Sequence, residues 1–144
     1  MHTIKLILFG KLKEPYLREA CAEYEKRLGA YCKLETIELL PQRTLDEEAA
    51  LALSKISSRA SVAALCIEGK HMSSEQFAAW LAQQPNEIVL LIGSSHGMSE
   101  TLKARANLRL SMSAMTFPHQ LARVMALEQL YRAFQINTGG KYHK

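Results

Sequence analysis

The sequence predicts an α/β protein built on a parallel sheet that helices cover on both faces. Short apolar runs alternate along the whole chain with segments whose apolar residues recur at helical spacing. The runs are apolar at consecutive positions, which is typical of strands buried on both faces. The chain has 144 residues, 48% of them hydrophobic, with no linker, low-complexity tract or internal repeat. We therefore expect one domain over residues 1–144.

The first third of the chain predicts a strand, a helix and a second strand. The apolar run TIKLILF predicts a strand over residues 3–9, and apolar positions on one side of residues 15–28 predict a helix that Gly29 ends. Residues 33–40 alternate roughly between apolar and polar types, which predicts a strand that closes at Pro41. Lysines follow the first run and no small-residue cleavage site appears, which favours a buried strand over a signal peptide.

The middle of the chain predicts two helices on either side of an apolar strand. Residues 45–56 have helical spacing, and Thr44 with Glu47 three residues later has the capping-box pattern. The run SVAALCI predicts a strand over residues 61–67. Residues 73–83 predict a helix that one of the two serines at its start caps, with its aromatic residues turned inward.

The last part of the chain holds the most apolar strand and the longest helix. The run EIVLLI predicts a fully buried strand over residues 87–92. A short helix over 99–106 and a short strand over 107–110 follow. Residues 118–136 predict a long helix, in which the proline suits the first turn and Thr116 is a candidate cap.

Basic residues gather in the last third of the chain, whereas most acidic residues precede it. The net charge is +4 and the pI is about 9.0. From residue 101 onward Glu128 is the one acidic residue. A positive field centred on this region permits a polyanionic partner such as a nucleic acid, and a solvated basic face without a function is the alternative.

The three cysteines, Cys21, Cys32 and Cys66, form no CxxC pair. This spacing predicts neither a metal site nor a redox site, and an odd number without a disulfide framework suits the cytoplasm. We expect all three to be small buried apolar residues. No run reaches the roughly 18 apolar residues that span a membrane, so we expect neither a metal nor a membrane among the partners.

Two apolar strands end in glycine turns, LCIEGK over 65–70 and IVLLIGSSHG over 88–97. Ligands gather at the carboxyl ends of strands in open α/β sheets, where glycine lets the backbone approach them closely. GSSHG is not GxGxxG and has no Walker lysine, so a dinucleotide or P-loop site is a poor interpretation. These turns predict the rim of a pocket, and plain connections between strand and helix are the alternative.

An uncharged loop and a short tail are the other candidate sites. The loop LSMSAMTFP over 110–118 is unusual because surface loops are normally polar, so it either packs on the core or lines an apolar pocket. His119 and, one turn later, Arg123 follow on one helix face. The tail GGKYHK over 139–144 offers groups that suit phosphates and bases, unless it is simply frayed.

Taken together, these segments resemble the ribosomal RNA large-subunit methyltransferase H family of the SPOUT class. The similarity lies in LLIGSSHG, LSMSAMTFPHQLARVMALEQLYRAFQI and the terminal KYH, and the opening ILFGKLKEPYLREACAEYEKRL fits as well. It therefore covers essentially the whole chain. The resemblance implies a SPOUT-type α/β knot, in which the C-terminal segment threads through a loop to form a trefoil. It also implies a homodimer with the cofactor pocket near its interface.

The resemblance further implies S-adenosylmethionine as cofactor and 23S rRNA in the assembled ribosome as partner, methylated at N3 of a pseudouridine in a stem-loop. The family usually has a second glycine where this chain has Ser94, and serine would be strained there if the position required a positive φ. The family's cofactor contacts fall on Leu65, Gly93, Met112, Ser113, Ala114, Met115, Thr116 and Phe117. Such a role explains the uncharged loop, because adenine binds between apolar walls and backbone polar groups.

The proton on N3 of the target base must leave for methyl transfer, and histidine suits this task near neutral pH. His119 and His143 are the candidate bases. We favour His143, with Tyr142 stacking on or orienting the base; positioning without a base is the alternative. The residues expected to contact RNA phosphates or the carbonyls of the target are Arg123, Lys141 and Lys144.

Two other classes of function stay open. A non-catalytic RNA-binding module would keep the fold without the cofactor, and its one support is the Ser94 departure. A small-molecule enzyme would use Gly93 and Gly97 for a phosphate. The segment 93–99 has no lysine or arginine, which argues against a phosphate site.

Overall fold

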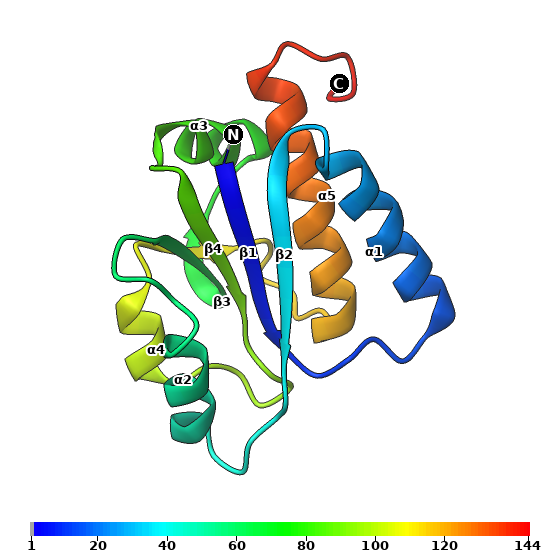
Figure 1. The fold of residues 1–144 in the computed structure, drawn as a ribbon. Coiled ribbons are helices and arrows are strands. Elements are labelled where there is room, and N and C mark those ends of the chain that lie inside the picture. The colour runs from blue at the N-terminus through cyan, green and yellow to red at the C-terminus, as the bar shows by residue number, and fades with distance from the viewer. Residues whose placement is uncertain (1) are drawn as a thin grey trace.

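The computed structural model describes residues 2–144 and has a five-stranded sheet with helices on both faces (Figure 1). The strand order is β2-β1-β4-β3-β5, and every pairing is parallel. This confirms the predicted α/β fold with a parallel sheet covered on both faces. In chain order the elements are β1 (His2–Phe9), α1 (Pro15–Leu28), β2 (Cys32–Leu39), α2 (Leu45–Leu53), β3 (Ser61–His71), α3 (Ser74–Gln83), β4 (Glu87–Ile92), α4 (Glu100–Arg105), β5 (Leu108–Ser111) and α5 (His119–Asn137).

Successive residues of the central strands enter two separate cores. On β1, Leu6 and Leu8 pack in the core beneath α1, α3 and α5, whereas Ile7 and Phe9 pack in the core beneath α2 and α4. Because side chains alternate across a strand, a strand between two helical layers must be apolar at every position. This is why β4 is apolar at every position from Ile88 to Ile92 and why β1, apart from Lys5, is apolar from Ile4 to Phe9.

Side-chain caps start three of the helices. Thr44 Oγ1 accepts a hydrogen bond from the backbone N–H of Glu47 at 3.1 Å, as its position predicts. Ser73 and Gln76 form a complete capping box at α3. Ser99 Oγ accepts from the backbone of the first turn of α4 at 3.1 Å. Each cap satisfies one N–H group that the helix itself leaves unpaired.

Two elements differ from the prediction by more than two residues at one end. The helix predicted over 45–56 ends at Leu53, although Ile56 still packs on the same core, so the apolar spacing continues past the last helical turn. The strand predicted over 61–67 continues to His71, because β3 resumes its pairing with β5 after an irregularity. Gly69 permits this, since a Cβ there would lie 2.8 Å from backbone atoms of β5.

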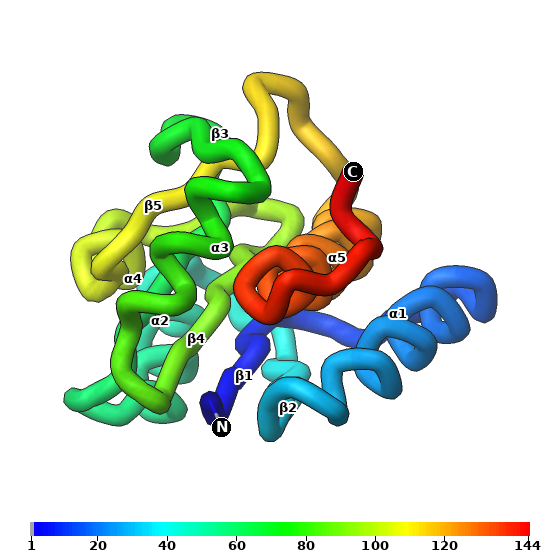
Figure 2. The backbone as a smooth tube through the Cα atoms, turned by 90° about the horizontal axis from the view of Figure 1, so that it is seen from above, coloured from blue at the N-terminus to red at the C-terminus, as the bar shows by residue number. Residues whose placement is uncertain are grey.

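The longest helix, α5, lies between α1 and α3 (Figure 2). It begins at His119 with Pro118 in the capping position and no side-chain cap, so the expectation that Thr116 caps this helix is wrong. Thr116 instead lies in the loop before α5, where it lines a cavity. Among residues 2–144, no helix is long and apolar enough to cross a membrane.

Candidate functional site

A cavity of about 600 Å³ lies at the carboxyl ends of β3, β4 and β5. These strands are neighbours in the sheet, so the segments that follow them converge at one edge. The end of β3, the turn after β4, the loop between β5 and α5 and the first turn of α5 form the walls. Most of the lining residues are apolar or small, which is typical of a site for an organic ligand.

The turn after β4 brings the backbone to the cavity wall. A Cβ on Gly93 would lie 2.5 Å from the carbonyl oxygen of Gly97, so this position has no room for a side chain. Gly97 has a φ of +95°, which glycine adopts without strain. Ser94 pairs with Gly97 in a short bridge and has no positive φ. The serine that departs from the family pattern is therefore unstrained, and the argument for a lost cofactor site has no structural basis.

The loop between β5 and α5 forms another part of the cavity wall. Ser111 Oγ donates to the carbonyl oxygen of Ser113 at 2.9 Å, and the backbone N–H of Met115 donates to Ser113 Oγ at 3.0 Å. Of the eight residues expected to contact the cofactor, seven line the cavity; Ala114 does not. These seven are Leu65, Gly93, Met112, Ser113, Met115, Thr116 and Phe117.

Several lining residues were not expected from the sequence to belong to the site. Cys66 and Met98 add to the apolar wall, and Glu68 and Lys103 bring charge to it. Lys103 Nζ donates to a carboxylate oxygen of Glu68, although the two residues lie 35 positions apart. No local pattern marks such a pair, because only the pairing of β3 with its neighbours brings α4 beside the end of β3.

His119 and Arg123 begin α5 together, but the structure separates their surroundings. His119 lines the large cavity. The Arg123 side chain is 8% exposed, and its Nη1 donates to Glu38 Oε2 on β2 at 2.7 Å. Burial raises the pKa of the nearby Glu25 carboxyl despite the Arg123 charge. The guanidinium is thus committed to carboxylates of its own chain and does not face the cavity.

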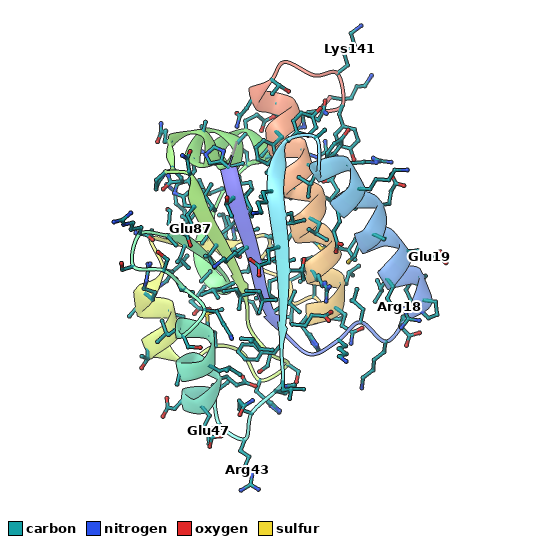
Figure 3. All side chains as sticks on the ribbon, in the orientation of Figure 1. Arg18, Glu19, Arg43, Glu47, Glu87 and Lys141 are labelled. Carbon is teal, nitrogen blue, oxygen red and sulfur yellow. The ribbon has the colours of Figure 1, made fainter. Side chains whose placement is uncertain are left out.

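The tail is docked on α5 and α3. Tyr142 OH donates to Glu128 Oε2 at 2.6 Å, and the Arg132 guanidinium lies over the Tyr142 ring, 4.8 Å from its centroid. His143 Nε2 lies 2.6 Å from Glu75 Oε1 at the start of α3. The lysines on either side are exposed, and Figure 3 shows Lys141 pointing away from the fold.

The contacts of His143 define which of its nitrogens carries the proton. Arg132 Nη1 lies 3.0 Å from His143 Nδ1 and can only donate, so Nδ1 accepts. Nε2 then carries the proton and donates to Glu75. In this docked arrangement Nδ1, the nitrogen of His143 that could accept a proton, already accepts a hydrogen bond from Arg132. His143 can accept a proton from a substrate only after the tail leaves Arg132.

A second cavity of about 250 Å³ lies on the tail's side of the same loop. It shares Leu65, Leu110, Ser111 and Met112 with the large cavity. Glu128, which holds Tyr142, also lines it. The tail therefore lies beside a cavity that shares four lining residues with the large cavity.

The contacts that hold the tail on α5 predict that the stability of the protein depends on pH. Burial raises the pKa of the Glu128 carboxyl, but hydrogen bonds from Arg132 and Tyr142 outweigh this and hold the pKa below its usual 4.5. The hydrogen bond to Glu128, with burial, raises the pKa of Tyr142 above its usual 10.0. Because the pKa of Glu128 is lowered, its ionised carboxylate stabilises the docked tail at neutral pH. This stabilisation is lost as the pH falls from 4.5 through the lowered pKa. The raised phenol pKa contributes below pH 10, and this is lost as the pH rises beyond it.

We expect Tyr142→Phe to lower the free energy of unfolding by about 1 kcal/mol, because it removes one hydrogen bond to a carboxylate that solvent partly screens. The loss should be constant between about pH 6 and pH 9 and shrink in acid. Urea unfolding at several pH values measures it, with Tyr16→Phe on the exposed surface of α1 as control. A loss that persists unchanged at about pH 3 would contradict the role of Glu128.

A parallel α/β sheet whose adjacent strands end at one largely apolar cavity defines a protein of the nucleotide- or cofactor-binding class. A family model described as "Predicted SPOUT methyltransferase" matches residues 2–143. The chain belongs to the SPOUT methyltransferases and, within them, to the ribosomal RNA large subunit methyltransferase H family.

Two relatives and one solved structure illustrate the similarity. Ribosomal RNA large subunit methyltransferase H of Streptococcus thermophilus (strain ATCC BAA-491 / LMD-9) is 46% identical over 157 aligned residues, covering 98% of this chain and 99% of that protein. The protein of that name from Clostridium beijerinckii is 45% identical over 159 residues, covering 99% of each. A probable methylase family protein from Haemophilus influenzae Rd KW20 superposes with a TM-score of 0.58 at 10% identity, over 98% of this chain and 70% of that one. This last likeness shows a shared fold.

Proposed function

We propose that this protein transfers a methyl group from S-adenosylmethionine to N3 of a pseudouridine in a stem-loop of 23S rRNA, acting on assembled ribosomes. The observation that carries the proposal is the cavity, which seven of the eight residues expected from the family resemblance line together. The relatives' printed names, which specify the large subunit's ribosomal RNA, support the substrate class.

The residues present fit the cofactor. The cavity volume of about 600 Å³ falls within the usual range of ligand pockets, roughly 300–1,000 Å³. Met112 and Phe117 offer apolar walls for adenine, and the close turn at Gly93 brings backbone polar groups to the rim. When bound, the cofactor supplies an activated methyl group on its sulfonium. The protein must then hold the acceptor nitrogen in line with that group.

The proton on N3 of the target needs an acceptor, and the two candidate histidines differ in their surroundings. His119 lines the cavity directly. His143 lies on the tail, with Nδ1 held by Arg132. We retain His143 as the favoured base and infer that the tail must leave this seat to act, with Tyr142 moving alongside it. Lys141 and Lys144 are exposed and free to meet phosphates, whereas Arg123 is buried against Glu38.

We also propose that residues 1–144 form one SPOUT domain with a trefoil knot, which works as a homodimer in the cytoplasm. The path of the chain supports the knot, because it leaves the edge strand β5 and returns across the sheet to lie between α1 and α3 (Figure 2). Tyr16 on α1 and Leu121 on α5 are large exposed apolar residues, which supports a partner on this side. Size-exclusion chromatography with light scattering tests the dimer, and an active monomer would refute it.

The decisive experiment incubates the protein and labelled S-adenosylmethionine with ribosomes that lack the modification. We expect one labelled nucleotide, a pseudouridine in a stem-loop of 23S rRNA. Label on another RNA, or on protein, would overturn the assignment. Heat-inactivated protein serves as the control.

Replacing His143 with alanine should lower the rate of methylation by at least about tenfold, because a positioned general base typically contributes 10² to 10⁴. The affinity for S-adenosylmethionine should change little, since His143 does not line the cavity. Single-turnover methylation and calorimetry measure the two quantities. His71→Ala, an exposed histidine at the end of β3, is the matched control. Unchanged turnover in His143→Ala with a large loss in His119→Ala would transfer the role to His119.

A further inference from the structure

We infer that Glu68 and Lys103 bind the zwitterionic amino-acid end of S-adenosylmethionine, the carboxylate of Glu68 taking the ligand's ammonium and the ammonium of Lys103 taking its carboxylate. This inference rests on the proposed function, because it assigns one end of that cofactor to one end of the cavity. The assignment follows from where the charges of the cavity lie.

Glu68 and Lys103 supply the permanent charges of the cavity wall. The other described residues that line it are apolar, glycine, serine, threonine or proline, apart from His119. Glu68 belongs to the end of β3 and Lys103 to α4. The pair thus joins two walls of the cavity at one place and leaves the remaining walls uncharged, as an adenine site requires.

The burial of the two partners is unequal. The Lys103 side chain is 14% exposed, whereas the Glu68 side chain is 54% exposed. Lys103 Nζ lies 3.7 Å from Glu100 Oε1 as well, so it has two carboxylates near it. A largely buried ammonium is costly without an opposite charge, and Glu68 supplies that charge when no ligand is bound. The more exposed Glu68 is free to turn toward a ligand.

Both groups stay charged near neutral pH. The hydrogen bond from Lys103 lowers the pKa of the Glu68 carboxyl, and the same hydrogen bond raises the pKa of the Lys103 ammonium. The cavity therefore presents one fixed negative and one fixed positive charge side by side. An isolated anion such as phosphate would meet repulsion from Glu68 as well as attraction from Lys103, so this pair disfavours a phosphate ligand.

An amino-acid zwitterion has the complementary arrangement. Its ammonium and carboxylate are neighbours on one carbon and carry no net charge together. When it enters, one ion pair of the protein opens and two ion pairs between protein and ligand form, so neither Lys103 nor Glu68 loses an oppositely charged partner. Charge-assisted hydrogen bonds of this kind favour one orientation of the ligand in the cavity.

Calorimetry with three ligands tests the inference: S-adenosylmethionine, S-adenosylhomocysteine and 5′-methylthioadenosine, which lacks the amino-acid end. We expect Lys103→Met and Glu68→Gln each to weaken the first two by about tenfold or more, the usual effect of losing a hydrogen bond to a charged group. Binding of 5′-methylthioadenosine should stay within about twofold of the wild-type value. That unchanged binding also shows that the cavity of each variant is intact.

Lys5→Met and Glu87→Gln are the matched controls. Lys5 Nζ and Glu87 Oε1 lie 3.9 Å apart and join β1 to β4 at the amino-terminal end of β4, and neither residue lines the cavity. They should leave the binding of all three ligands unchanged. Equal losses of affinity for S-adenosylmethionine and 5′-methylthioadenosine in the Lys103 and Glu68 variants would show that the pair only stabilises the fold of the cavity. That result would overturn the inference.

Two further results are distinguishable. Wild-type binding of S-adenosylmethionine in the Glu68 and Lys103 variants would overturn the inference and leave the proposed function standing. A wild-type protein that binds none of the three ligands would overturn the proposed function, and the inference would fall with it.

Discussion

Replacing Gly93 with valine is expected to weaken the binding of S-adenosylmethionine by about a hundredfold. A Cβ at this position would lie 2.5 Å from the carbonyl oxygen and 2.9 Å from the carbonyl carbon of Gly97. Backbone atoms cannot rotate away as a side chain does, so the turn must shift. Overpacking of this kind typically costs about 1–3 kcal/mol, and a cost of about 2.8 kcal/mol is a hundredfold in affinity if it falls on the bound state.

Calorimetry on Gly93→Val measures the affinity, and thermal unfolding shows whether the fold survives. Ser94→Gly is the control, because it changes the adjacent residue to the family's usual type without adding an atom. Ser94 has no positive φ, so glycine there brings no relief of strain and the affinity should stay close to the wild-type value. Normal affinity in Gly93→Val would count against the turn after β4 as a wall of the cofactor site.

Replacing Glu38 with alanine is expected to lower the free energy of unfolding by about 2–3 kcal/mol. The substitution leaves the Arg123 guanidinium buried without its main partner, and breaking a buried ion pair from one side costs about 3–5 kcal/mol. We expect less than that range because the Glu38 side chain is 32% exposed, so water already screens the pair. Glu25 also lies near the guanidinium and compensates part of the charge.

Arg123→Met should lower the free energy of unfolding by less, about 1 kcal/mol. It keeps an apolar side chain in the core, and the Glu38 carboxylate that it leaves unpaired is accessible to water. The double variant should be more stable than the sum of the single losses predicts. Urea unfolding followed by the fluorescence of Trp80, the one tryptophan of the chain, measures all three. A stable Arg123→Met protein that fails to methylate ribosomes would restore Arg123 to the RNA-contacting role expected from the sequence.

The fold class could be predicted from the sequence because it depends on local periodicity. The apolar-rich runs of β1 and β4 follow from burial on two faces, and the cap at Thr44 acts within one turn of helix. The ends of elements were less predictable where the apolar spacing continues beyond the last helical hydrogen bonds, as it does after Leu53. The extension of β3 to His71 depends on pairing with β5, which is remote in the chain.

The candidate site, too, was predictable only in part. The uncharged loop around Met112 and the turn at Gly93 stand out in the sequence, and both line the cavity. Their assignment to a cofactor came from the family resemblance. The contrast between His119 and Arg123 was not predictable: they lie one turn apart on one helix, yet the first lines the cavity and the second pairs with β2 across 85 positions of sequence.

By itself, the sequence determined a basic α/β protein, the residue types along its strands and the family resemblance, because these depend on neighbours within a few positions. Only the tertiary structure decided which charges meet. The order β2-β1-β4-β3-β5 puts the ends of β3 and β4 and the residues after β5 at one cavity, and it sets Lys103 beside Glu68. The packing of α3 beside α5 also brings His143 to Glu75 across 68 positions of sequence. Partners so far apart in the chain leave no local pattern, because the free energy that joins them arises when the sheet assembles.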